Sequence, residues 1–173
     1  FQNVNQSLRV DDAFMEAADA GAPYALRAVT TDEVIDEVDA DEVLREVAEG
    51  THVCGDPGLQ YEDTIQRWHT CKATGPINSS NPCSEYMHLD NSACNLASLN
   101  LLRFLRDDDT FDVEGFKAAV GVIFTAQEIL VGRADYPTES IGDTSRKFRQ
   151  LGIGYANLGA LLMALGHAYD SDD

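Results

Sequence analysis

The sequence predicts an α/β fold. Segments with apolar residues at helical spacing alternate along the chain with short segments in which apolar and polar residues alternate, as they do in strands. The composition fits a core-forming chain of about one domain, because 44% of the 173 residues are hydrophobic. Gly (13), Pro (5) and Cys (4) are too few for a collagen-like, low-complexity or disulfide-scaffold protein.

The first third of the chain predicts three strands and two helices. Residues 6–10 have the pattern of a short strand, and Asp12 is positioned to cap a helix that follows it. Residues 24–38 favour two short strands around a polar turn. An amphipathic helix is then expected to begin at Asp39 or Asp41.

The segment 51–94 has a different character. It is dense in Gly, Pro, Asn, Ser and Thr, its periodicity is weak, and it contains all four cysteines and three of the four histidines. These features predict a long loop region. Loops of that length inside a compact fold are uncommon and more often functional than decorative.

The remaining sequence predicts one strand and two helices. Residues 97–101 alternate between apolar and polar side chains, which favours a strand. Helical spacing extends from 116 to 130, and Tyr136-Pro137 ends that pattern. The last segment, 151–165, places its large apolar residues on one helical face, interrupted by glycines that permit close backbone approach.

An excess of acidic side chains limits the expected partners and location. Thirty acidic residues against twelve basic ones give a net charge of −18, which argues against binding to nucleic acid or to an anionic membrane surface. No apolar run is expected to approach the roughly 20 residues of a membrane span, and no signal peptide opens the chain. We therefore expect a cytoplasmic protein.

The kind of charge suggests a halophilic source. Asp outnumbers Glu by 19 to 11, and Arg outnumbers Lys by nine to three. A strongly acidic, lysine-poor surface suits a protein that stays hydrated in concentrated salt, where its self-repulsion is screened. An acidic mesophilic enzyme is the alternative.

The four cysteines at 54, 71, 83 and 94 leave several interpretations open. Their spacings of 17, 12 and 11 residues differ from the tight pairs of a zinc site, so no metal is predicted. His52, His69 and His88 are interpreted as polar loop residues. A structural disulfide is disfavoured because nothing marks the chain as secreted, and an inert buried thiol is the default for a single cysteine.

Cys83 has neighbours suited to acid–base chemistry. In the segment Asn81-Pro82-Cys83-Ser84-Glu85, alternate residues are an amide, a thiol and a carboxylate. An extended segment would present these three side chains on the same side, within about 14 Å. Pro82 stiffens the segment by restricting Asn81. An ordinary Asn-Pro turn with an incidental cysteine is an equal alternative on spacing alone.

These residues resemble ribonucleotide reductases, in particular the adenosylcobalamin-dependent class II. Residues 81–86 (NPCSEY), followed by 93–101 (ACNLASLNL), are similar to the finger loop and the next strand of that family. The further motifs that agree in order are CGDPG at 54–58, WHTC at 68–71, RQLGIGYAN at 149–157 and YDSD at 169–172. The resemblance extends from Asn3 to the last residue.

The resemblance implies a role for each residue of the NPCSE segment. Cys83 matches the cysteine that becomes a thiyl radical and abstracts the 3′-hydrogen of the ribose. Glu85 matches the general base that takes the 3′-hydroxyl proton. Asn81 matches the amide that holds the substrate hydroxyls, and Pro82 and Ser84 complete the substrate-binding segment.

Cys94 matches one of two cysteines that supply the reducing electrons and finish as a disulfide. Its family partner lies upstream of Phe1, so we pair Cys94 with neither Cys54 nor Cys71 and assign those two no catalytic role. The resemblance also implies adenosylcobalamin as cofactor, a ribonucleoside di- or triphosphate as substrate, a thioredoxin-like or dithiol reductant, and a homodimer of the full-length protein.

Residues 1–173 are thus expected to be an internal fragment of a ten-stranded α/β barrel, with the finger loop at about 76–94. Alone, the fragment is expected to be inactive, because sheet edges and half of a core would be exposed. Two alternatives remain. One is a class I large subunit that takes its radical from a separate metal-containing subunit, and the other is a non-catalytic acidic binding module.

Overall fold

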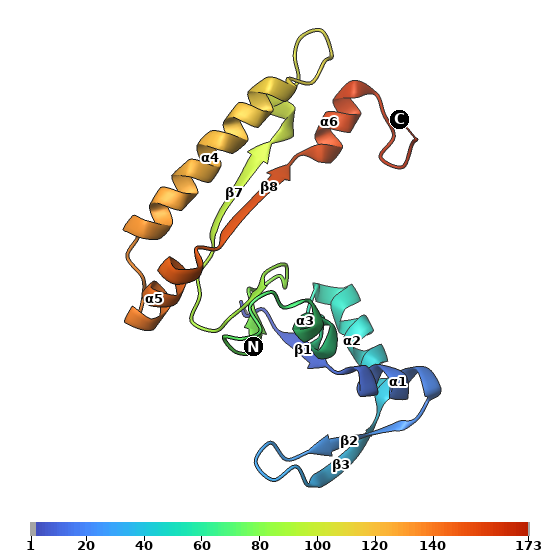
Figure 1. The fold of residues 1–173 in the computed structure, drawn as a ribbon. Helices are drawn as coiled ribbons and strands as arrows, with labels where there is room; N and C mark the ends of the chain where they lie inside the picture. Colours follow the sequence, from blue (N-terminus) through green and yellow to red (C-terminus); the bar gives the residue numbers. More distant parts are fainter. Residues whose placement is uncertain (1–2, 173) are drawn as a thin grey trace. The chain divides into compact units, whose positions relative to one another are not determined.

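The computed structural model describes residues 3–172 and is a mixed α/β structure (Figure 1). The chain divides into two compact units, residues 1–90 and 91–173, each with its own short sheets and helices. The described residues form four two-stranded sheets and close no barrel.

The first unit is built on two parallel strands. Strand β1 (Ser7–Val10) pairs with β4 (Gly58–Tyr61), and the register sets Arg9 beside Gln60. Helix α1 (Asp12–Ala20) follows β1, an antiparallel hairpin of β2 (Pro23–Arg27) and β3 (Val34–Asp39) comes next, and helix α2 (Ala40–Cys54) returns to β4. Helix α3 (Glu62–Trp68) and the small hairpin β5 (Ser79–Ser80) and β6 (Met87–His88) complete this unit.

Apolar burial fixes the first two helices of this unit. Its core consists of Val10, Phe14, Ala18 and Ala40, and the rings of Phe14 and Tyr24 pack edge to face at 5.3 Å. Asp11, rather than the expected Asp12, caps α1 by accepting a hydrogen bond from the Phe14 amide. Asp39 caps α2 and so decides between the two expected starts of that helix.

The second unit is also built on a parallel pair. Strand β7 (Asn95–Asn100) pairs with β8 (Leu151–Ala156), and the long helix α4 (Val113–Arg133) runs along both strands (Figure 1). The 3-10 helix η1 (Leu101–Phe104) precedes α4, whereas α5 (Glu139–Phe148) and α6 (Leu158–Leu165) flank β8. The strand expected at 97–101 and the helix expected at 116–130 are confirmed.

Three expectations for secondary structure were wrong. The segment 51–94 is less irregular than expected, because it holds the end of α2 together with β4, α3 and the β5–β6 hairpin. The segment 151–165 begins as strand β8 and becomes helical only at Leu158. Pairing with β7 accounts for this, and Leu151, Ile153 and Tyr155 have the period-two spacing of a strand. Helix α5 was missed.

Helix α4 corrects the expectation that no apolar run approaches a membrane span. Its 21 residues are long and apolar enough to cross a membrane by length and composition. Core helices of soluble proteins pass the same test, which makes this weak evidence for a span. Apolar side chains on the helix are largely exposed within the described chain, for example Val122 and Ile129.

Candidate active site

The segment that carries Cys83 is a tight hairpin turn. Strands β5 and β6 pair through Ser79 with His88 and Ser80 with Met87. Beyond them, the Asn81 amide donates to the Tyr86 carbonyl at 3.3 Å, and the Ser84 amide donates to the Asn81 carbonyl at 3.1 Å. Of the two alternatives left open on spacing, the structure shows the Asn-Pro turn and not the extended segment, so the same-side argument for alternate residues does not apply.

The turn exposes the reactive groups and uses the Asn81 amide to close itself. The Asn81 side-chain oxygen accepts a hydrogen bond from the Tyr86 amide at 2.9 Å, which leaves its NH2 group to donate elsewhere. Cys83 and Glu85 are both exposed, whereas Asn81 is half-buried. The structure brings Asn81, Cys83 and Glu85 into one turn. Within the described part of the chain, their side chains do not hydrogen-bond to one another.

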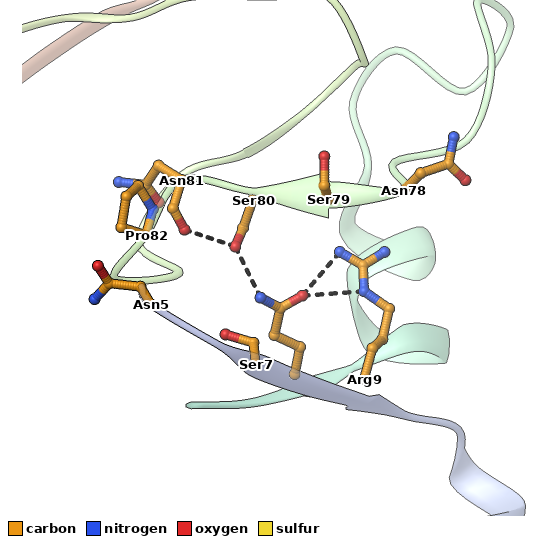
Figure 2. Close-up of a pocket in the computed structure, with 9 residues that line it drawn as sticks. Asn5, Ser7, Arg9, Asn78, Ser79, Ser80, Asn81 and Pro82 are labelled. Atoms are coloured by element: carbon orange, nitrogen blue, oxygen red, sulfur yellow. Dashed lines mark hydrogen bonds between the residues drawn. The ribbon is translucent and has the colours of Figure 1, made fainter. Parts of the chain in front are cut away.

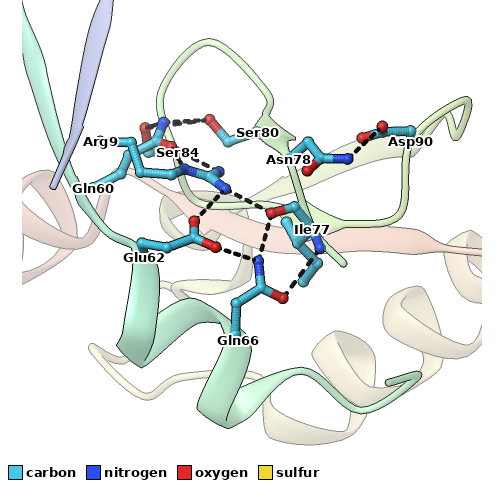
Figure 3. A network of polar contacts seen from close by, with 9 residues as sticks. All are labelled: Arg9, Gln60, Glu62, Gln66, Ile77, Asn78, Ser80, Ser84 and Asp90. Atoms are coloured by element: carbon cyan, nitrogen blue, oxygen red, sulfur yellow. Dashed lines mark hydrogen bonds and ion pairs between the residues drawn. The ribbon is translucent and has the colours of Figure 1, made fainter. Parts of the chain in front are cut away.

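A hydrogen-bond network fastens this turn to the parallel strands (Figure 3). Gln60 of β4 donates to the hydroxyls of Ser80 and Ser84, at 2.8 and 2.9 Å. Arg9 of β1 donates to the Gln60 side-chain oxygen from Nε at 3.0 Å and from Nη2 at 2.9 Å. Arg9 also donates to the Ile77 carbonyl at 2.6 Å.

Glu62 and Gln66 extend the network to the base of the hairpin. Glu62 accepts from Arg9 at 3.0 Å, in an ion pair whose arginine side chain is only 18% exposed. Gln66 of α3 donates to Glu62 at 2.9 Å and to the Ile77 carbonyl at 2.7 Å, and it accepts from the Ile77 amide at 3.2 Å (Figure 3). These two residues therefore hold the chain before the turn rather than the turn itself.

A polar hollow of about 450 Å³ lies beside the turn (Figure 2). Asn5, which lies two residues before β1, contributes to the lining with Ser7 and Arg9 of β1, Gln60 of β4 and residues 78–82. The lining residues carry amides, hydroxyls and one guanidinium, together with the ring of Pro82. These polar groups can donate hydrogen bonds to a hydroxyl-bearing ligand and accept them from it.

The β7 end of the second unit holds Cys94. This half-buried thiol directly precedes β7, and a Cβ atom at Gly152 of the paired strand would lie 3.2 Å from its sulfur. Gln127 of α4, which is 3% exposed, donates to the carbonyls of Asn95 and Gly152 at 3.0 and 2.8 Å. The position of Cys94 thus depends on a strand ladder and on a close approach of backbone.

The similarity of the chain to known protein families identifies its family. The family model for the ribonucleotide reductase barrel domain matches residues 1–173. The chain belongs to the ribonucleotide reductase family. Because the match covers the whole chain, the described strands and helices form a segment of that family's barrel domain.

Curated relatives of this reductase chain are similar along its length. The vitamin B12-dependent ribonucleotide reductases of Streptomyces clavuligerus and Rhodopirellula baltica are 58% and 51% identical to it, each over 99% of the chain. The vitamin B12-dependent ribonucleoside-diphosphate reductase of Mycobacterium tuberculosis is 33% identical over 98%. The chain spans 18%, 17% and 24% of these three proteins, respectively.

The other cysteines of the reductase segment lie in different surroundings. All four are present as thiols. Cys54 ends α2 and is exposed. Its sulfur lies 3.3 Å from both the Gly50 and the Asp56 carbonyl oxygens, so its single S–H can donate to either. Cys71 is half-buried, and its amide donates to His69 Nδ1 at 3.2 Å.

Two of the three histidines differ from the expected loop residues, because His52 lies in α2 and His88 in β6. His69 lies in the loop directly after α3, as expected, but is only 8% exposed. His69 Nδ1 accepts from the Cys71 amide, so its Nε2 carries the proton that is donated to the Gly75 carbonyl at 2.9 Å. Burial, with a smaller contribution from His69, lowers the pKa of His88 below its usual 6.5. Among residues 3–172, no group of three or more His, Cys, Asp or Glu side chains is arranged to hold a metal ion.

Sequence reasoning missed Arg9, Gln60 and Ser80. Arg9 and Gln60 belong to strands 51 residues apart in sequence, and only the β1–β4 register makes them neighbours. The sequence offered one signal for Arg9: it is a charged residue inside a strand whose next residue, Val10, is buried.

Proposed function

We propose that this chain is the central part of a vitamin B12-dependent ribonucleotide reductase, which converts ribonucleoside di- or triphosphates to 2′-deoxyribonucleotides for DNA synthesis. The observation that carries the proposal is the exposed Cys83 thiol at the tip of a fixed turn that also holds Asn81 and Glu85. The names of the relatives support the cofactor and the reaction. In this proposal the segment contributes to a ten-stranded barrel, with residues 76–94 as the finger loop.

Cys83 acts as the carrier of a hydrogen atom. Its sulfur radical takes the hydrogen from ribose C3′ and later returns it, which is feasible because S–H and sugar C–H bonds are of similar strength. Glu85 accepts the 3′-hydroxyl proton, and Asn81 donates its NH2 group to substrate hydroxyls, the role left to it by its bond to Tyr86. Pro82 and Ser84 hold the backbone of this substrate-binding turn.

Cys94 supplies reducing electrons together with a second thiol outside residues 1–173. As the ribose 2′-hydroxyl leaves as water, the two thiols give up two electrons and two protons and become a disulfide. A thioredoxin-like protein or a small dithiol restores them. A homodimer and a cytoplasmic location complete the proposal, with no nucleic acid or membrane as partner.

Adenosylcobalamin, when bound, supplies the radical that starts the reaction. To receive this radical the chain needs an accessible thiol. Cys83 provides one, because the turn leaves its side chain exposed. The described residues hold no metal-binding cluster of their own.

The first test measures deoxynucleotide formation by the full-length protein with a dithiol, with and without adenosylcobalamin, on di- and triphosphate substrates. We expect product only when the cofactor is present. Product that requires a separate radical-generating subunit instead would identify a class I enzyme. No product under any of these conditions, from a folded protein, would favour the non-catalytic binding module.

A pair of cysteine variants tests the assignment of Cys83. Cys83→Ser should abolish turnover, because a hydroxyl hydrogen is bound too strongly to be exchanged with a sugar C–H. Cys54→Ser is the matched control, since Cys54 is equally exposed but lies at the end of α2. It should turn over normally. Retained turnover in Cys83→Ser would contradict the proposed role.

A further inference from the structure

We propose that Gln60 is a positioning residue that sets the orientation of the turn carrying Cys83. This inference rests on the proposed function and deepens it. Gln60 lies on β4, 23 residues before Cys83, and it does not contact the thiol; it acts through Ser80 and Ser84 (Figure 3).

The Gln60 side chain is buried and its hydrogen-bonding capacity is fully used. It is 6% exposed. Its two N–H groups go to Ser80 and Ser84, and its oxygen accepts two bonds from Arg9. A buried amide that makes four hydrogen bonds to three partners is held in one orientation, because any rotation leaves a polar atom unsatisfied.

Arg9 decides which way the Gln60 amide points. A guanidinium has only donors, so the oxygen of Gln60 must face Arg9 and its nitrogen must face the two serines. Arg9 is itself fixed by Glu62 and the Ile77 carbonyl. The Gln60 side-chain amide thus connects the turn to strands β1 and β4 and fixes the position of the turn relative to them.

The two serines lie on either side of Asn81 and Cys83, two of the three residues assigned to the chemistry. Ser80 precedes Asn81 and donates its hydroxyl to the Asn81 carbonyl at 2.8 Å. Ser84 follows Cys83 and has a left-handed backbone with φ of 64°, which a non-glycine residue adopts only when its surroundings hold it there. Gln60 therefore holds the residues on both sides of the three-residue stretch 81–83, whose last residue, Cys83, is the hydrogen-atom carrier.

This arrangement matters for a hydrogen-atom transfer. The reaction needs the sulfur close to one C–H bond and aligned with it, and a misplacement of about 1 Å can cost about a hundredfold in rate. Cys83 is exposed, so packing around its own side chain does little to fix it. The geometry points to the Gln60 amide as the group that supplies this constraint.

The test uses the full-length holoenzyme with Gln60→Leu and, as matched control, Gln66→Leu. Gln66 also donates two hydrogen bonds, but to Glu62 and the base of the hairpin at Ile77. We expect Gln60→Leu to lower kcat about ten- to a hundredfold and Gln66→Leu to leave it within about twofold. Equal losses in both variants, or none in Gln60→Leu, would overturn the proposal.

A double-mutant cycle distinguishes positioning from a general loss of packing. The Ser80→Ala/Ser84→Ala protein should lose about as much kcat as Gln60→Leu, and adding Gln60→Leu to it should cost little more. Additive losses would show that Gln60 does not act through the serines. The serine pair also keeps the test decisive if Gln60→Leu fails to fold, because it leaves the Arg9–Gln60 contact in place.

Two further readouts do not depend on activity. Hydrogen exchange of peptides spanning 79–88, and alkylation of Cys83 relative to Cys54, should both become faster in Gln60→Leu and remain unchanged in Gln66→Leu. If Cys83→Ser retains turnover, the proposed function fails while these readouts still decide whether Gln60 orders the turn. If Cys83→Ser is inactive but Gln60→Leu is normal in kcat, only the positioning role fails.

Discussion

The two cysteines assigned to chemistry are held by different kinds of interaction. Cys83 lies in a turn that side-chain hydrogen bonds connect to β1 and β4, across sequence separations of 20 to 51 residues. Cys94 directly precedes a strand whose parallel ladder and backbone contacts to Gln127 fix it. The hydrogen-bond ladder between β7 and β8 defines the register of the two strands, whereas the side-chain network around Gln60 can set the orientation of the single turn that carries Cys83.

This difference predicts different sensitivities to substitution. Removal of a side chain from the Arg9–Gln60 network leaves buried polar atoms without partners, which is costly. The backbone bonds of the β7–β8 ladder near Cys94 survive most substitutions, so apart from Gln127 that region is sensitive mainly to added volume at its closest approach.

The largest effect is expected for Arg9→Leu. This change leaves the Gln60 oxygen and Glu62 without their shared donor, and we expect a loss of about 2–4 kcal/mol in the stability of the first unit. Arg67→Leu is the matched control, because its ion pair with Asp12 is exposed on both sides and is worth about 0–1 kcal/mol. The stability losses of both variants are measured by thermal unfolding and by hydrogen exchange of β1 and β4 in the full-length protein. Equal losses would contradict the difference in burial.

The next effect is expected at Gly152, near Cys94. A Cβ atom there would overlap the Leu96 side chain and lie 3.2 Å from the Cys94 sulfur. Leu96 is 68% exposed and can rotate away, so the thiol takes most of the displacement. We expect Gly152→Ala to cost about 1 kcal/mol, measured by hydrogen exchange of β7 and β8.

Gly154→Ala is the matched control on the same strand, where the nearest side-chain atom, Ser98 Oγ, is 3.8 Å away. It should be neutral or slightly stabilising, because alanine loses less backbone entropy than glycine on folding. A destabilisation as large as that of Gly152→Ala would show that general strand packing, rather than the approach to Cys94, governs this region.

The same contrast explains what the sequence could predict. Local signals found the caps near Asp11 and Asp39, the strand before η1 and the long helix α4, because neighbouring residues determine these features. The segment at 151–156 was assigned to a helix because its partner, β7, lies more than 50 residues away. The sequence left a turn and an extended segment at Cys83 as equal alternatives for a related reason: Gln60 and the serines that hold the turn meet only in the folded chain.

The candidate residues themselves were accessible to sequence reasoning, since the NPCSE segment is contiguous. Arg9 and Gln60 were not. Their pairing follows from a parallel register, and no pattern in either strand specifies which residue of the other will lie beside it. Contacts of this kind are where a structure adds most to a sequence motif.

A smaller effect is expected from salt, and it too separates the two units. Residues 1–90 carry 18 acidic and five basic side chains, whereas residues 91–173 carry 12 and seven. Raising KCl from about 0.1 M to about 1 M should screen more repulsion in the first unit. Hydrogen exchange should therefore slow more in residues 3–90 than in 91–172. An equal response, or none, would favour the acidic mesophilic enzyme over the halophilic one.

The smallest expected effect is a pH dependence at the hairpin. His88 stacks on Tyr86 with ring centroids 5.7 Å apart, and burial, more than the neighbouring His69, holds its pKa below 6.5. The unfolded chain thus binds a proton more readily than the folded one, so this contribution to stability is present above pH 6.5 and is lost as the pH falls through and below that value.

Protection factors of peptides spanning 79–88 should fall on acidification, and His88→Gln should reduce that fall. His52→Gln, a change on the exposed face of α2, should leave it unaltered. An unchanged acid response in His88→Gln would show that His88 is not the source of the pH dependence.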